Sequence, residues 1–182
     1  SEAETRAREW GVAMLRVNGL SNVHVEPFAI PYWDATREAA YIITPGARAM
    51  VAVALGGSPS TPAGGLEAEI VRFPDLAALE AAPNEAVAGR IVFIDERMVA
   101  MQDGAGYGVA VRKRGRCAPI AQSKGAAGCL IRSVGTDSHR NPHTGMMRTI
   151  EGAAVVPAAA LSNPDADQLE RAIAHSKGPV TL

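Results

Sequence analysis

Apolar positions at the start of the chain recur at alternating steps of three and four residues, from Ala3 to Val17. This spacing predicts one amphipathic helix, and Asn18-Gly19 predicts its end. Residues 22–31 then alternate between polar and apolar side chains, which predicts an extended strand that Pro27 restricts to a sheet edge. After Pro31, turn residues separate three further predicted strands, at residues 38–44, 48–55 and 66–73.

The second half of the chain alternates predicted helices and strands. A short helix is expected at residues 74–82, and the nearly continuous apolar run Gly89–Asp95 predicts a strand covered on both faces. The glycine-rich stretch Gln102–Gly108 predicts a flexible loop. The remaining predicted elements are a helix from about Arg116 to Lys124 with Pro119 in its first turn, strands at residues 129–133 and 155–161, a helix with Asn163 as N-cap and Pro164 as first residue, and the start of a strand at residues 179–182.

This order, a β-rich first half followed by strand, helix, strand, strand, helix and strand, favours an α+β fold. In such a fold two small sheets pack on each other and helices cover one outer face.

Composition and charge narrow the class of protein. The 182 residues are 47% apolar and 20% charged, as expected of one soluble globular domain. A net charge of −1 argues against a nucleic-acid partner. No apolar run approaches the roughly 18 residues of a membrane span, and the polar start Ser1–Glu9 lacks the order of a signal peptide. Cys117 and Cys129 allow either one bridge or two buried thiols, of which the buried thiol is commoner for Cys129 in its apolar run.

Two histidines in one segment are the first candidates for chemistry. His139 and His143 are four apart, the spacing that places two zinc ligands on one helical face. Asn141-Pro142 lies between them and excludes a regular helix, so solvated or loop-stabilising histidines are the default interpretation. A stand-alone hydrolase that uses this pair is a third and weaker hypothesis. Its test is metal analysis with an aminopeptide assay.

Two surface features have simpler interpretations. The basic run Arg112–Arg116 contains no interleaved aromatic residue, so it predicts a solvated face or a docking patch. Trp10, Tyr32 and Trp33 predict core packing or an interface.

Three motifs in the second half, in the right order, carry a family resemblance. They are GRIVFID at residues 89–95, the segment from Ile120 to Ser133 that contains SKGAAGCLIRS, and the segment VPAAALSNPDADQLERAI at residues 156–173. Together they resemble the protease-associated domain. The flanking segments are similar to those of secreted zinc exopeptidases of the carboxypeptidase Q group, in particular residues 8–33, LIRS at 130–133 and NPHTG at 141–145.

The resemblance implies a three-layer β/β/α domain of the swivelling type, inserted into an enzyme that is extracellular or periplasmic. Residues 1–35 would be the peptidase lead-in, residues 36–178 the protease-associated domain, and residues 179–182 the return strand to the catalytic domain. In the family, zinc and the general base belong to the catalytic domain. No catalytic or metal-binding residue is therefore expected in this chain, and zinc is expected only in the catalytic domain.

The implied function is that of a non-catalytic module that covers the active-site cleft and aids selection of peptide substrates. The expected partners are the catalytic domain of the same polypeptide and the peptide. Candidate cleft contacts lie on the irregular segment 139–148, which carries polar groups: His139, Arg140, His143, Thr144 and Gly145. Local packing of this segment is an equally weighted interpretation. The alternative function is a protein-interaction or homodimerisation module with Trp10, Tyr32 and Trp33 at its interface.

Overall fold

The computed structural model describes residues 1–148 and 155–182. Contacts divide the chain into two compact units, Ser1–Tyr32 and Trp33–Leu182. The domain boundary expected at residue 35 stays a prediction.

The first unit consists of one helix and an extended tail. Helix α1 (Glu2–Val17) forms as predicted, because Ser1 and Glu4 make a reciprocal capping box at its start. It ends where predicted, at Asn18, and Gly19 follows with a φ of +82°. The edge strand predicted over residues 22–31 is wrong: these residues form no strand. Pro27 and Pro31 lack backbone donors, and no strand of this unit offers a partner.

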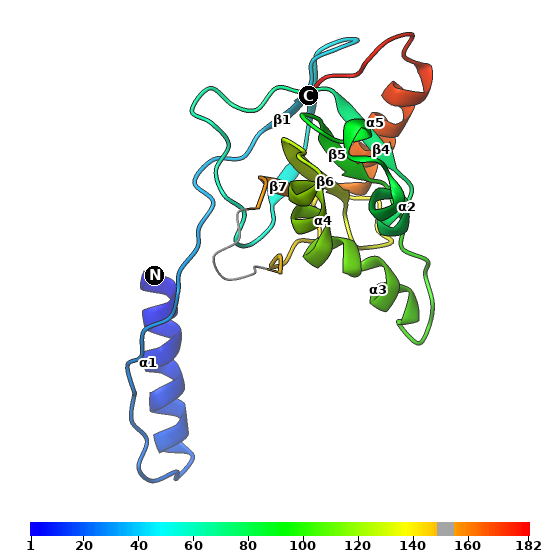
Figure 1. The fold of residues 1–182 in the computed structure, drawn as a ribbon. Helices are drawn as coiled ribbons and strands as arrows, with labels where there is room; N and C mark the ends of the chain where they lie inside the picture. Colours follow the sequence, from blue (N-terminus) through cyan, green and yellow to red (C-terminus); the bar gives the residue numbers. More distant parts are fainter. Residues whose placement is uncertain (149–154) are drawn as a thin grey trace. The chain divides into compact units, whose positions relative to one another are not determined.

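The described residues of the second unit form two sheets (Figure 1). Strands β1 (Ala40–Ile42) and β2 (Arg48–Met50) form a small antiparallel sheet. The larger sheet has the order β3-β7-β6-β5-β4 and is parallel except for β3. Its strands are β3 (Ala52–Ala54), β4 (Ile70–Phe73), β5 (Ile91–Ile94), β6 (Gly128–Arg132) and β7 (Ala158–Leu161). The single strand predicted at residues 48–55 is therefore two strands that belong to different sheets and separate at Val51, whose carbonyl accepts from the Ser162 N–H.

The helices of this unit are α2 (Leu76–Ala81), the short 3-10 helix η1 (Asn84–Ala86), α3 (Ala105–Ala110), α4 (Arg112–Ser123) and α5 (Asn163–His175). Helix α4 begins before the predicted Arg116, so Pro119 lies inside the helix and not in its first turn. Helix α5 begins one residue earlier than predicted, with Ser162 as N-cap, because the Ser162 hydroxyl accepts from the Asp165 N–H. Within the described ranges, no helix is both long and apolar enough to cross a membrane.

The loop predicted at residues 102–108 is wrong, because α3 occupies part of it. Gly104 opens this helix with a φ of +75°, and the Asp103 carboxylate accepts from the Ala105 N–H at 2.9 Å. Gly106 is required by close packing. A β-carbon at this position would lie 1.9 Å from the Val99 carbonyl oxygen.

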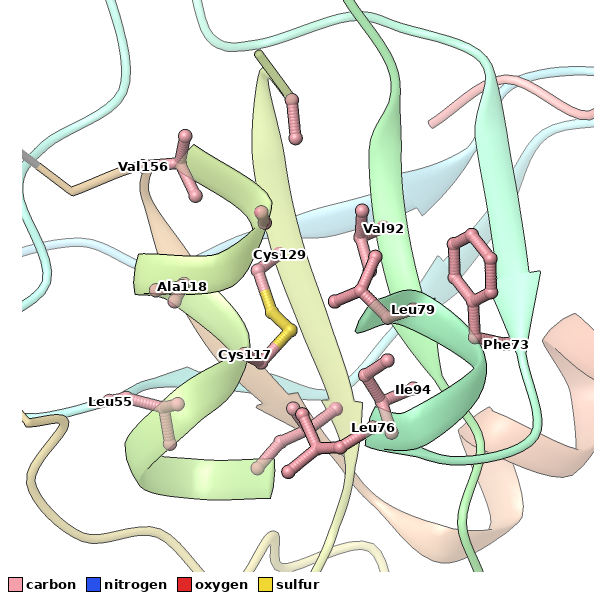
Figure 2. Packing of buried hydrophobic residues seen from close by; sticks show 14 of the residues in the cluster. Leu55, Phe73, Leu76, Leu79, Val92, Ile94, Cys117, Ala118, Cys129 and Val156 are labelled. Atoms are coloured by element: carbon pink, nitrogen blue, oxygen red, sulfur yellow. A yellow bond between two sulfur atoms is a disulfide. The ribbon is translucent and has the colours of Figure 1, made fainter. Parts of the chain in front are cut away.

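The side chains of β5 alternate between two cores. Val92 and Ile94 lie in the first core, where they face α2 and α4, as Figure 2 shows. Ile91 and Phe93 lie in the second core, where they pack with α5 and the small sheet. All four are buried, as predicted for a strand covered on both faces. The α+β class with two small sheets is confirmed. The helical layer on one face consists of α2 and α4, while α5 packs on the opposite face beside the small sheet, since its Leu169 lies in the second core.

A disulfide joins Cys117 of α4 to Cys129 of β6 inside the first core (Figure 2). It resolves the open alternative in favour of the bridge, and the buried-thiol interpretation of Cys129 is wrong. Both cysteines are buried, so the bridge fixes α4 directly to the centre of the sheet.

The last residues complete the second core. Val180 and Leu182 are buried there, and Thr181 forms isolated bridges with Thr44 and Glu69. The strand expected at residues 179–182 is thus reduced to single bridges.

Candidate functional site

The segment between β6 and the undescribed residues carries the candidate cleft contacts, and several backbone bonds hold it. The His143 N–H donates to the Ser133 hydroxyl at 2.6 Å. The Gly56 N–H donates to the Gly145 carbonyl at 3.0 Å, and the Met147 N–H donates to the Gly56 carbonyl at 2.9 Å. These bonds fix residues 143–147 of the segment to the body of the second unit.

One of the two ring nitrogens of His143 takes part in a hydrogen bond. Its Nδ1 lies in hydrogen-bonding distance of the Val134 carbonyl, which can only accept, so Nδ1 carries a proton. Its Nε2 has no hydrogen-bond partner among the described residues. The ring lies 6.0 Å from that of Tyr107 on α3, centroid to centroid. In its neutral form His143 thus presents an acceptor on an exposed side chain.

Gly145 lies directly against Arg114 of α4. A β-carbon at Gly145 would be 2.9 Å from the Arg114 Cδ and Nη1 atoms. Any larger residue would therefore displace either this segment or the guanidinium. Thr144 beside it is half-buried.

Arg140 serves a local structural role. It donates two hydrogen bonds to the Asp165 carboxylate, from Nε at 3.0 Å and from Nη2 at 2.6 Å. Burial raises the pKa of Asp165, but hydrogen bonds from Arg140 and Ser162 outweigh it, so this pKa lies below its ordinary value. The ion pair attaches the segment to the first turn of α5, where a carboxylate is also favoured by the helix dipole.

His139 and His143 do not form a zinc site. The Nδ1 of His139 accepts from the Asn141 N–H at 3.2 Å, and the Nδ1 of His143 donates to a carbonyl. Within the described parts of the chain, no group of three or more His, Cys, Asp or Glu side chains could hold a metal ion.

A network of six charges lies where the parallel strands of the larger sheet end. Arg132, at the end of β6, donates from Nε to the Asp95 carboxylate after β5 at 2.7 Å. Arg72 of β4 donates to the other oxygen of Asp95 at 2.6 Å. Three further members surround this centre, namely Arg97, Asp167 and Glu170.

Three guanidinium groups balance three carboxylates in this network, so it needs no external ligand. Burial raises the pKa of Asp167, but hydrogen bonds from Arg132 and Arg97 have the larger effect. The pKa of Asp167 therefore lies below its ordinary value. Arg132 and Asp95 are almost completely buried, so the network joins β5 and β6 to α5. Sequence reasoning missed this cluster. The signal available was a charged residue at the end of each of two apolar strands, Asp95 directly after β5 and Arg132 as the last residue of β6.

The basic run lies within α4 and is not simply a solvated face. Arg112 and Arg116 are exposed, but Lys113 and Arg114 are buried. The Lys113 ammonium donates to the Glu96 carbonyl. Burial lowers the pKa of Lys113 to about 8, against the opposing effect of Glu96.

The three predicted interface residues fall into both units. Trp10 and Tyr32 belong to the first unit, where their side chains are 68% and 83% exposed. Trp33 belongs to the second unit, where its Nε1 donates to the Ser58 carbonyl at 3.0 Å. Among the described residues, the side chains of Trp10 and Tyr32 thus form no hydrogen bond, whereas that of Trp33 does.

Comparison with known proteins relates the chain to exopeptidases. Carboxypeptidase Q of Xenopus laevis is 34% identical over 157 residues, which are 86% of this chain and 32% of that protein. The Homo sapiens protein is 32% identical over 161 residues, 88% of this chain and 33% of its own length. The chain therefore spans about a third of the length of these curated relatives. No family model matches it.

Two solved structures are similar in fold. A peptidase M28 precursor from Shewanella amazonensis has a TM-score of 0.90 and 42% identity, covering 100% of this chain and 41% of that one. A zinc aminopeptidase from Bacillus subtilis has a TM-score of 0.61 over 100% of this chain and 37% of its own. Its identity of 19% supports a likeness of fold alone.

Proposed function

Because this chain is a relative of carboxypeptidase Q and of peptidase M28 proteins, we propose that it is the non-catalytic protease-associated domain of a zinc exopeptidase. In this role it covers the active-site cleft and aids the selection of peptide substrates. The relationship itself confirms the resemblance that the motifs predicted.

One observation carries the proposal: the whole chain matches a minor part, 41%, of a peptidase precursor at 42% identity. A catalytic domain elsewhere in the same polypeptide would hold the zinc and would be this domain's partner. We extend the proposal to compartment: an extracellular or periplasmic location suits the Cys117–Cys129 disulfide.

The segment 139–148 is the proposed cleft contact. His143 presents Nε2 as an acceptor, and backbone bonds at Ser133 and Gly56 fix the segment that carries it. A polar group held in this way can position a peptide without large entropic cost. Arg140 and His139 point to local roles instead, since their polar groups bond to Asp165 and Asn141.

The test compares peptide turnover by the full-length enzyme with and without His143→Ala. The proposal predicts a raised KM with folding preserved. His175→Ala is the matched control, because His175 is also exposed and also bonds through Nδ1 to a carbonyl, that of Arg171. Unchanged kinetic constants in His143→Ala would remove the cleft contact from the proposal.

A protein-interaction or homodimerisation module is the second candidate. It is favoured by exposed aromatic side chains in the first unit, namely Trp10, Phe28 and Tyr32. Sedimentation of the full-length protein and of this chain distinguishes the two. Self-association of both would support the module, whereas self-association of this chain alone would indicate a surface that the catalytic domain normally covers.

A further inference from the structure

A pocket beside α4 combines positive charge with apolar walls. Its volume is about 400 Å³, and its charged lining consists of four arginines, Arg112, Arg114, Arg116 and Arg148. Val111 and Met146 contribute apolar surface, and no acidic side chain among the described residues lines it. We call it the arginine pocket. Its size is within the range of small-ligand sites.

The helix itself explains why Arg148 reaches this pocket. Pro119 has no N–H, so the Gly115 carbonyl one turn earlier has no helical donor. The Arg148 N–H donates to that carbonyl instead, at 3.2 Å. Gly115 also leaves space for the Arg148 side chain, because a β-carbon there would be 3.2 Å from the Arg148 Cγ atom. The segment that carries Arg148 is thus bound onto α4.

Arg114 is the group that indicates a ligand. It is only 9% exposed. Its Nη1 donates to the Tyr107 hydroxyl at 3.2 Å, but its buried Nε and Nη2 have no hydrogen-bond partner within the described residues. The Tyr107 ring, 5.9 Å from its Cζ atom, offers a weak cation–π contact and no negative charge.

The arginines of this pocket, unlike those around Arg132, are not matched by an equal number of carboxylates among the described residues. Among the described residues, neither Arg112, Arg114 nor Arg148 forms an ion pair, and only Arg116 has a carboxylate, that of Glu80 at 2.6 Å. A buried guanidinium without a carboxylate is costly, and an anion bound in the pocket would balance its charge.

We propose that the arginine pocket binds the carboxylate of an acidic peptide side chain. The exposed guanidinium groups of Arg112 and Arg148 can donate paired N–H groups to a carboxylate, and the buried guanidinium of Arg114 adds positive charge beside them. Val111 and Met146 supply apolar surface for the methylene groups of a glutamyl residue, which a free phosphate lacks. The assignment does not rest on the cleft role, because binding is measured on this chain without turnover.

The experiment titrates the 182-residue chain with three probes by calorimetry or NMR: N-acetyl-glutamyl-amide, N-acetyl-glutaminyl-amide and inorganic phosphate. We expect saturable binding of the glutamyl probe that weakens with salt, and at least about tenfold weaker binding of the neutral glutaminyl probe, because charge-assisted hydrogen bonds are lost. Equal binding of the two amides would overturn the proposal, as would binding of phosphate alone or of no probe.

Variants locate the binding. Arg114→Met keeps the length of the side chain and should weaken the glutamyl probe at least about tenfold. Arg148→Met removes an exposed charge without disturbing the core, and a clear loss there keeps the test valid if Arg114→Met fails to fold. Arg171→Met on α5 is the matched control, since Arg171 is exposed and lies outside the pocket. Unchanged binding in Arg148→Met, or an equal loss in Arg171→Met, would contradict the assignment.

Discussion

Arg132 and Asp95 end neighbouring parallel strands and form an ion pair in which both side chains are at most 1% exposed. Asp95→Asn would leave the buried guanidinium without its central carboxylate. We expect the free energy of unfolding to fall by about 3 kcal/mol, the lower range for breaking a buried pair, because Asp167 still contacts Arg132.

Chemical denaturation measures this loss. Arg97→Gln removes a charge of the same network whose side chain is 56% exposed, and it should cost less than about 1 kcal/mol. Similar losses for the two variants would show that burial does not determine the contribution of this network.

The disulfide predicts sensitivity to reduction. It closes a short loop of sequence separation 12, so its loss should cost about 3 kcal/mol in the chain-entropy description. We expect dithiothreitol to lower the urea midpoint of the native chain. The double variant Cys117→Ala/Cys129→Ala should start from the lower midpoint and show no response to dithiothreitol, and an equal response of both proteins would rule out this origin.

Helix α3 offers a matched pair of glycines. Gly106→Ala places a β-carbon on the Val99 carbonyl oxygen, whereas a β-carbon at Gly108 meets nothing within 4 Å. We expect Gly106→Ala to destabilise by about 1–3 kcal/mol through overpacking. Gly108→Ala should be neutral or stabilise by up to about 1 kcal/mol, because alanine favours helix. Thermal unfolding distinguishes the two, and equal shifts would mean that the contact with Val99 is absent.

Acid should destabilise the second unit through two aspartates of α5. Hydrogen bonds from arginines hold the pKa of Asp165 and of Asp167 below the ordinary value of 3.8. A lowered folded-state pKa contributes stability that is fully present above the unfolded value and is lost as pH falls through the folded value. Unfolding measured from pH 6 downward should therefore show a steep loss of stability beginning near the ordinary aspartate value.

The contribution of Asp165 is removed by Arg140→Gln. Its acid transition should begin from a lower stability and be less steep than that of the native chain. An unaltered pH profile in this variant would contradict the role assigned to the Arg140–Asp165 pair.

Lys113 predicts a response of the same sign at high pH. Its pKa is lowered from 10.5 to about 8 in the folded chain. Between these values the folded state has released a proton that the unfolded state still binds, so stability attributable to this group rises with pH. Lys113→Met should remove that rise while keeping most of the side-chain packing. A persistent rise in the variant, measured by urea unfolding from pH 7 to 10, would assign it to another group.

Sequence reasoning succeeded where local pattern and tertiary packing agree. The run at residues 89–95 became a strand buried on both faces, and Asn18-Gly19 ended α1. It failed at the edge strand near Pro27 and at the loop predicted around Gly106. In the first case no partner strand exists within the unit, and in the second a glycine pattern typical of a flexible loop reflects close backbone packing instead.

The candidate site was predictable only in part. His143 and Arg140 were chosen because polar groups on an irregular segment often bind ligands, yet Arg140 is fixed by Asp165, which lies 25 positions further along the chain. The buried state of Arg114 depends on Gly145 and Tyr107, which belong to other elements. Neither long-range pairing leaves a signal in the local sequence.

The Ile43 N–H donates to the Thr181 carbonyl at 2.8 Å, so two backbone stretches that are far apart in the sequence lie side by side. In the proposed exopeptidase, a unit with these two stretches together could be inserted into a catalytic domain without separating its points of attachment.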